Sequence, residues 1–137
     1  MLVVLDTNVI YAALRSSRGA SFALLRRVVD GDFQMALSVA LCLEYEDVAF
    51  REPLTLPERA INDILDQLVA VSVRPRMAFL WRPQLRDPKD DMVLELAINA
   101  NCPYIVTFNI RDFRGSEAFG IQANTPAQFL ALLGGPS

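Results

Sequence analysis

Short apolar runs alternate with longer amphipathic stretches along this chain. Residues 2–5 form a continuous apolar run that is typical of a strand buried on both faces, and residues 33–37 and 104–107 have a similar character. A last edge strand is expected over residues 119–122. Because strands that alternate with helices are joined by crossover connections, the pattern predicts an α/β fold with three layers, in which helices cover both faces of a mostly parallel sheet.

Helical spacing of apolar residues fills the stretches between these strands. The expected helices cover residues 9–14, 20–29, 39–51, 56–69 and 127–133, together with one that begins after Asp87. Ser38, Asp87 and Thr125 are expected to cap the helices that follow them, and the last two are each followed by proline, which suits the first helical position. Thr55 and Glu58 have the spacing of a capping box.

The remaining segments complete the expected organisation. A short strand is expected over residues 71–73, followed by an irregular segment over residues 74–86. No repeat, linker or low-complexity stretch divides the chain, so residues 1–137 are expected to form one domain, with residues 134–137 as a frayed tail. The first residues are typical of a strand and not of a signal peptide, and no apolar run reaches the roughly 18 residues of a membrane helix. A cytoplasmic protein without a membrane partner is therefore expected.

Composition narrows the available chemistry. The chain has 13 basic and 16 acidic residues, a net charge of −3, and no histidine. A protein that coats nucleic acid is usually strongly basic, so any nucleic-acid contact is expected to be local. The lack of histidine excludes Ser-His-Asp and Cys-His catalysis and the common zinc sites. Cys42 and Cys102 form no CxxC pattern and are expected to be reduced. Carboxylates with a hard cation remain as catalytic groups.

Polar residues gather where the strands of the expected sheet end. Asp6 directly follows the first strand and Asn109 follows the third, while Glu44 lies in the helix after the second strand. Asp90 and Asp91 lie in the first turn of the helix that precedes the third strand. Ligands of open parallel sheets bind outside the carboxyl ends of the strands. If the first and third strands are neighbours, these side chains share one mouth.

Clustered carboxylates repel one another unless a cation or a raised pKa relieves the repulsion. Oxygen ligands suit Mg²⁺ or Mn²⁺, which can activate a water for phosphodiester hydrolysis. Each residue also has a purely structural interpretation. Asp6 suits a turn or a helix cap, Glu44 suits a solvated helix face, and the Asp90/Asp91 pair suits the helix dipole.

The ordered set of motifs resembles the PIN-domain family, particularly putative toxins of toxin–antitoxin systems related to VapC. The matching segments are Val4-Leu5-Asp6-Thr7-Asn8-Val9, Leu43-Glu44-Tyr45, Asp87-Pro88-Lys89-Asp90-Asp91 and Tyr104-Ile105-Val106-Thr107. The resemblance implies a three-layer α/β/α fold and a pocket that binds Mg²⁺ or Mn²⁺ and cleaves RNA. Its acidic ligands would be Asp6, Glu44 and Asp90, with Asp91 not separable from Asp90 by spacing. Thr7 and Asn8 would support the first aspartate, and Thr107 would line the pocket wall.

One position departs from the common family pattern. Members often carry an aspartate two residues after the threonine, where this chain has Asn109. Some relatives have asparagine there with an aspartate three positions further on, as Asp112 is here. An amide brings no charge, so asparagine at position 109 argues against the binding of a second metal ion. It leaves the first metal site intact.

Arginines provide candidate substrate contacts, because their planar donors suit phosphate. Those at 74, 76, 82 and 86, together with Lys89, lead into the acidic helix, and those at 111 and 114 follow Asn109. The main candidates are Arg74, Arg76, Arg82 and Arg86. Their alternative interpretation is ordinary surface charge.

The resemblance also implies partners: an RNA substrate, an antitoxin protein and, as a possibility, a second copy of the chain. Two other functions stay open. The first is a non-catalytic PIN-like module that binds RNA or protein, which Asn109 favours. The second is a phosphatase with Asp6 as nucleophile, for which position 8 lacks the expected acid.

Overall fold

The computed structural model describes residues 1–51, 54–78, 85 and 87–134. The strands in this part of the chain are β1 (Leu2–Leu5), β2 (Gln34–Met35), β3 (Tyr104–Val106) and β4 (Gln122–Asn124). The α-helices are α1 (Thr7–Arg15), α2 (Ala20–Val29), α3 (Val39–Arg51), α4 (Glu58–Val71), α5 (Pro88–Asn99) and α6 (Pro126–Leu133). Two short 3₁₀ helices, η1 (Ile110–Phe113) and η2 (Ser116–Phe119), lie between β3 and β4.

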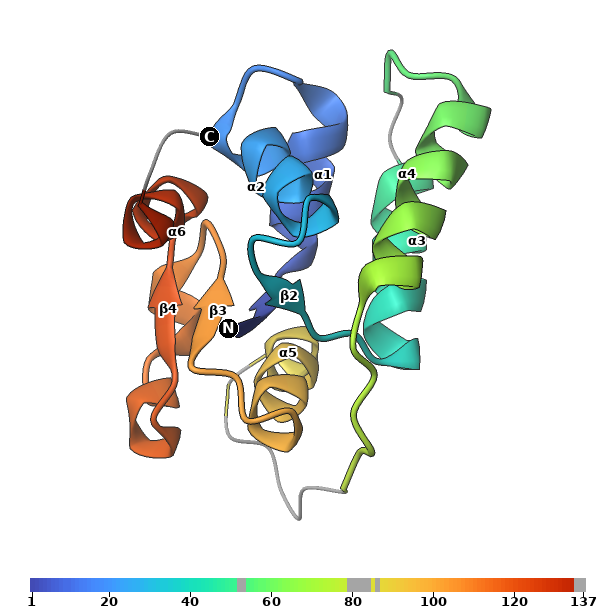
Figure 1. The fold of residues 1–137 in the computed structure, drawn as a ribbon. Coiled ribbons are helices and arrows are strands. Elements are labelled where there is room, and N and C mark those ends of the chain that lie inside the picture. The colour runs from blue at the N-terminus through green and yellow to red at the C-terminus, as the bar shows by residue number, and fades with distance from the viewer. Residues whose placement is uncertain (52–53, 79–84, 86, 135–137) are drawn as a thin grey trace.

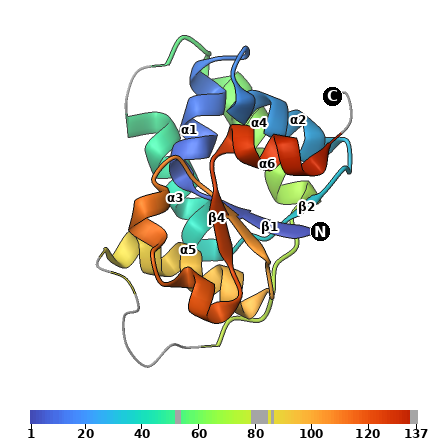
Figure 2. The same ribbon diagram turned by 90° about the vertical axis from the view of Figure 1, so that its left-hand side faces the viewer.

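The helices enclose a parallel sheet with the strand order β2-β1-β3-β4. Helix α5 lies on one side of the strands, and α1, α2 and α6 lie on the other (Figures 1 and 2). Helices α3 and α4 lie side by side beyond the β2 edge (Figure 1). This is the three-layer α/β/α arrangement that the sequence predicted. None of the described helices is long and apolar enough to cross a membrane.

The two central strands determine where a ligand can bind. β1 and β3 are neighbours, with Leu5 opposite Val106. The chain leaves β1 towards β2 on one side and leaves β3 towards β4 on the other, so their carboxyl ends flank a topological switch point. Open parallel sheets bind ligands at such points. The adjacency that the sequence analysis had to assume is therefore present.

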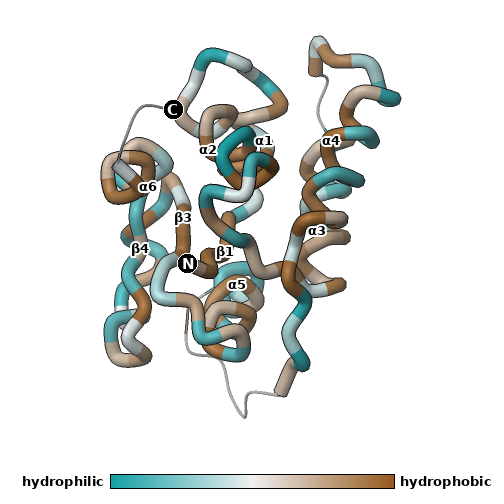
Figure 3. Tube along the Cα trace, viewed as in Figure 1, coloured by the Kyte–Doolittle hydropathy of each residue, from teal (hydrophilic) through white to brown (hydrophobic). Residues whose placement is uncertain are grey.

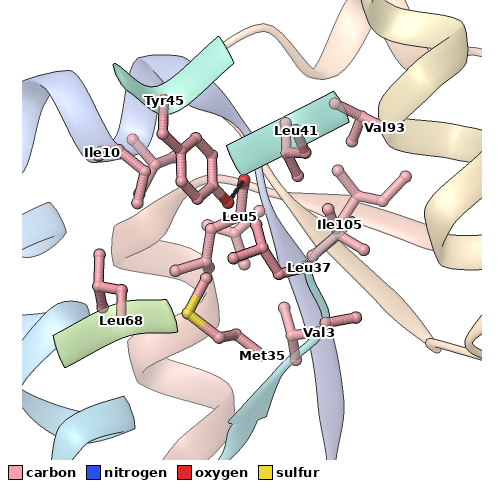
Figure 4. Packing of buried hydrophobic residues seen from close by; sticks show 14 of the residues in the cluster. Val3, Leu5, Ile10, Met35, Leu37, Leu41, Tyr45, Leu68, Val93 and Ile105 are labelled. Carbon is pink, nitrogen blue, oxygen red and sulfur yellow. Dashed lines mark hydrogen bonds between the residues drawn. The ribbon is translucent and has the colours of Figure 1, made fainter. Parts of the chain in front are cut away.

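The core is continuous across the sheet. β1 and β3 are hydrophobic along their length, whereas the edge strand β4 is mixed (Figure 3). Met35, Leu37 and Leu41 pack near Leu5 and the ring of Tyr45 (Figure 4). A core of this extent holds the ends of β1 and β3 in fixed positions, because close-packed interiors resist displacement.

Most helix boundaries agree with the sequence prediction. Helices α2 and α3 have the predicted bounds. The Ser38 hydroxyl accepts from the Leu41 amide at 3.1 Å, the Asp87 carboxylate accepts from the Lys89 amide, and Thr125 forms a capping box with Gln128. Each of these side chains satisfies an amide that the first turn of a helix leaves unpaired.

Three local predictions were wrong. Thr55 forms no capping box, because α4 begins at Glu58 after an extended Pro57, and proline disfavours a helical residue before it. The expected strand over residues 71–73 reduces to one bridge between Val73 and Ala36. The last strand begins at Gln122 and not at 119, because η2 and a left-handed Gly120 occupy the preceding residues. Residues 135–137 of the expected tail lie outside the described residues.

Candidate active site

Asp6 lies at the switch point between the two central strands. It ends β1 and caps α1, and its Oδ1 accepts from the Thr7 amide at 2.8 Å. Its Oδ2 accepts from the Thr107 hydroxyl, also at 2.8 Å. Only 7% of Asp6 is exposed. Hydrogen bonds on both oxygens fix the orientation of this carboxylate.

Thr107 joins the ends of β1 and β3 through hydrogen bonds. Its hydroxyl donates to Asp6 and accepts from the Asn109 amide at 3.0 Å and from the Asn8 side chain at 3.4 Å. A hydroxyl has one donor and two acceptor positions, so all are used. The Asn8 carbonyl oxygen in turn accepts from the Phe108 amide at 3.3 Å. The predicted supporting residues Thr7, Asn8 and Thr107 are thus brought together around Asp6.

Tyr45 supports the site from the hydrophobic core, a role that was not predicted from the sequence. Its ring is buried, and its hydroxyl donates to the Leu5 carbonyl at 2.5 Å (Figure 4). Burial raises the pKa of Tyr45 well above its usual value, and the negative charge of Asp6 adds to the effect. This bond ties α3 to the end of β1 and so positions the neighbouring Glu44. The Glu44-Tyr45 pair in the sequence was the available signal.

Four carboxylates converge on one pocket of about 200 Å³, and a fifth, that of Asp87, also lines it while its Oδ1 accepts from the Lys89 amide. Asp6 comes from the end of β1, Glu44 from α3, Asp90 from α5 and Asp112 from η1. The other lining residues are Thr7, Asn8, Asp87, Lys89, Met92, Val93 and Asn109. The pocket therefore gathers carboxylates from four separate segments of the chain.

The electrostatics of the pocket reflect this crowding. Burial raises the pKa of Asp6, while the hydrogen bonds from Thr107 and Thr7 act in the opposite direction. Burial also raises the pKa of Asp90 to about 6, and the charges of Asp6, Asp112, Asp87 and Asp91 contribute to the rise. Negative charge is in excess here, and a cation would relieve it.

Glu44 is paired with basic side chains. Lys89, the chain's single lysine, places its Nζ 3.1 Å from Glu44 Oε1, and Arg51 lies 3.8 Å from the same oxygen. Lys89 also lines the acidic pocket. By its place in the sequence Lys89 belongs with the arginines that lead into the acidic helix, but in the structure it lies among the carboxylates.

Asp91 is separated from the pocket although it follows Asp90 directly. Its Oδ1 accepts from the Leu85 amide at 2.7 Å, and it does not line the acidic pocket. Successive residues of a helix point in directions about 100° apart, and the bond to the Leu85 amide holds the Asp91 carboxylate away from the pocket. Asp91 thus holds Leu85, while Asp90 faces the carboxylates.

Among the described residues, none of the four arginines predicted to contact the substrate lines the acidic pocket. Arg74 and Arg76 are exposed and do not line the acidic pocket, and Arg82 and Arg86 lie outside the described residues. Arg74 lies near Cys42 of α3: burial and Glu46 raise the pKa of the Cys42 thiol, and Arg74 acts against them. Arg111 and Arg114 instead line a groove beside the carboxylates.

The donor set fits a hard cation. The donors that line the pocket include carboxylate, amide and hydroxyl oxygens, which suit Mg²⁺ and Mn²⁺. Among the described residues, no three acidic or cysteine side chains are already arranged to surround one ion. Asp6, Glu44, Asp90 and Asp112 are the residues that would hold a metal, and a metal bound by Glu44 would compete with Lys89 for its Oε1.

A second hollow can be set aside as the place of chemistry. It has a volume of about 290 Å³ and lies between α1, α2 and α4, with a mainly apolar lining that includes Phe22, Leu25 and Ile64. Beside this hollow, Ile61, Leu65 and Leu68 of α4 are buried in the core.

The fold and the pocket define an α/β protein with an acidic site at the switch point of a parallel sheet. The model of the PIN-domain family matches residues 2–111, and the chain belongs to this family, whose members are generally nucleases. Among solved structures, the chain is similar to the crystal structure of VapBC2 from Rickettsia felis bound to a DNA fragment from their promoter. The TM-score is 0.61 at 14% identity, covering 90% of this chain and 98% of that chain. No curated protein matches the chain in sequence.

Proposed function

We propose that this protein is a metal-dependent endoribonuclease that hydrolyses phosphodiester bonds with Mg²⁺ or Mn²⁺. The observation that carries the proposal is the convergence of Asp6, Glu44, Asp90 and Asp112 on one pocket. These four are the proposed metal ligands, so Asp112 takes the place that spacing alone gave to Asp91. Because Asp112 supplies a carboxylate, Asn109 does not leave the pocket short of charge, which weakens the case for a non-catalytic module.

The chain's own residues have separable roles in this proposal. A bound Mg²⁺ or Mn²⁺ supplies Lewis-acid activation of water and neutralises charge on the phosphodiester. Asp6 is oriented in advance by Thr7 and Thr107, so little ordering is needed when substrate binds. Asp90 can hold a proton near pH 6, and Asn109 presents an amide beside it.

The direct test is cleavage of a mixed RNA pool by the purified protein with Mg²⁺, with Mn²⁺ and with EDTA. Cleavage that requires either metal supports the proposal. If the protein binds no Mn²⁺ by calorimetry and cuts no RNA, the non-catalytic module becomes the better account. Cleavage that persists in EDTA contradicts the metal-dependent mechanism.

We further propose that the protein is the toxin of a toxin–antitoxin pair and that an antitoxin protein is its partner. The family and the likeness to VapBC2 support this. Co-expression with a small protein encoded beside it should yield a stable complex that cuts RNA more slowly than the isolated chain. Failure to form a complex, with no growth defect in cells that express the chain alone, would contradict the toxin role. A homodimer remains a proposal that sedimentation can test.

Removing the Lys89 charge is expected to strengthen metal binding. Lys89 pairs with Glu44 in the pocket, so a metal must displace it, and an exposed ion pair is worth at most about 1 kcal/mol. Lys89→Met should therefore raise Mn²⁺ affinity about threefold in calorimetry. Arg51→Met is the matched control, since Arg51 lies further from Glu44 and also pairs with Asp47. Equal effects of the two variants would show that only general charge matters.

A further inference from the structure

A groove adjoins the acidic pocket on the side of η1. Its volume is about 940 Å³, and Asp87, Asp90 and Asp112 line both hollows. The other residues that line it are Leu85, Pro88, Arg111 and Arg114. The groove thus begins at the carboxylates and continues between the start of α5 and η1. Its size lies in the range of ligand-binding sites.

Two arginines give this groove a charge opposite to that of the pocket. Arg111 lies in η1 and Arg114 caps its end, three residues further on. Side chains three apart on a 3₁₀ helix lie on the same face. Both are exposed, and in the described part of the chain no ion pair joins either to a carboxylate. Their donors are therefore available to a phosphate.

The element that carries these arginines is well anchored. Phe113, between them, is 1% exposed and packs into the core. The Asn109 amide that precedes η1 donates to Thr107, the residue that also holds Asp6. The arginines are consequently held in a fixed relation to the proposed metal ligands, which a binding site for a continuous strand requires.

We propose that this groove binds the segment of single-stranded RNA next to the scissile phosphate. In this proposal, which rests on the proposed ribonuclease function, Arg111 and Arg114 each hold backbone phosphate oxygens, and Leu85 and Pro88 contact a ribose or base. The protein carries a net charge of −3 and its pocket is acidic, so a polyanion needs local positive charge to approach. Single-stranded RNA exposes its bases and riboses to side chains such as Leu85 and Pro88, whereas a duplex keeps its bases paired inside the helix.

The test measures RNA binding without cleavage. The fluorescence anisotropy of a labelled ten-nucleotide single-stranded RNA is followed in the Asp6→Asn background, with and without Arg111→Gln and Arg114→Gln together. Affinity is expected to fall at least tenfold on removing both arginines. The slope of log affinity against log salt should fall in magnitude by about 1.4, because each phosphate contact on a single strand contributes about 0.7. The matched control is Arg74→Gln with Arg76→Gln, which should change affinity less than twofold.

The outcomes separate this inference from the ribonuclease proposal. Unchanged affinity and salt slope in the Arg111/Arg114 variant would overturn the groove, even if the wild type cuts RNA. Arginine-dependent binding by a protein that never cuts would support the groove while removing the nuclease function. Equal affinity for a duplex of the same length would overturn the single-strand preference.

Arg111→Lys with Arg114→Lys should recover only part of the affinity if paired donors, and not charge alone, hold the phosphate. Full recovery would contradict that geometry.

Discussion

Asp6→Asn is expected to lower metal-dependent RNA cleavage by about a thousandfold without unfolding the protein. A metal ligand whose charge acts on the transition state is worth several kcal/mol, and each 1.4 kcal/mol is a factor of ten in rate. The fold should survive because asparagine is as good a helix cap as aspartate, and its side-chain oxygen can still accept from the Thr7 amide. Initial rates at saturating Mn²⁺ measure the loss.

The control for this experiment is the stability of the same variant. Burial raises the pKa of Asp6, so its charged form is disfavoured in the folded protein. Removing the charge should offset the lost hydrogen bond from Thr107, so the thermal midpoint is expected to change little at neutral pH. Retained cleavage in a folded Asp6→Asn variant would show that Asp6 only caps α1. A large drop in the midpoint would mean that lost activity reflects unfolding, and Asp112→Asn would then be the better probe, because Asp112 is exposed on η1.

Features governed by local chemistry could be predicted from the sequence. The bounds of α3 follow from the Ser38 cap and from apolar spacing, and the apolar run of β1 made it a buried strand. The convergence of Asp6 and Glu44 followed from the rule that ligands bind at the carboxyl ends of parallel strands. The family match confirms the resemblance to PIN domains, and the residue roles which that resemblance implied stay predictions.

Features that depend on which way a side chain points in the folded protein could not be predicted. Asp90 and Asp91 are equivalent in composition and spacing, and only the position of the Leu85 amide shows which of them faces away. Lys89 precedes them and was grouped with surface arginines, yet it reaches Glu44 on another helix. Arg111 and Arg114 were candidates from the sequence, but their shared groove depends on a 3₁₀ helix, which leaves little periodic trace in four residues.

Near pH 8 the metal-free Asp90→Asn variant is expected to be more stable than the wild type. The Asp91→Asn variant is expected to be about as stable as the wild type. The folded pKa of Asp90 is about 6 against a usual value of 3.8. A raised carboxyl pKa gives stability that is present below about pH 4 and lost as pH rises through 6. Removing the charge therefore restores stability at high pH, by about 1 kcal/mol once solvent screening is allowed for, or roughly 4 °C in the midpoint.

The pair of variants also separates chemistry from anchoring. Asp90→Asn should lower cleavage at least a hundredfold, since it removes a proposed ligand. Asp91→Asn should keep cleavage within about threefold, because a carboxamide oxygen can still accept from the Leu85 amide. Both substitutions remove one acid from the first turn of α5, so the loss of interaction with the helix dipole is common to both and cancels in the comparison.

Thermal midpoints in EDTA between pH 4 and 8, with Mn²⁺-dependent rates on the same preparations, measure both effects. If Asp91→Asn proved the inactive member of the pair, Asp91 and not Asp90 would be the metal ligand, and the geometry of α5 proposed for catalysis would be wrong.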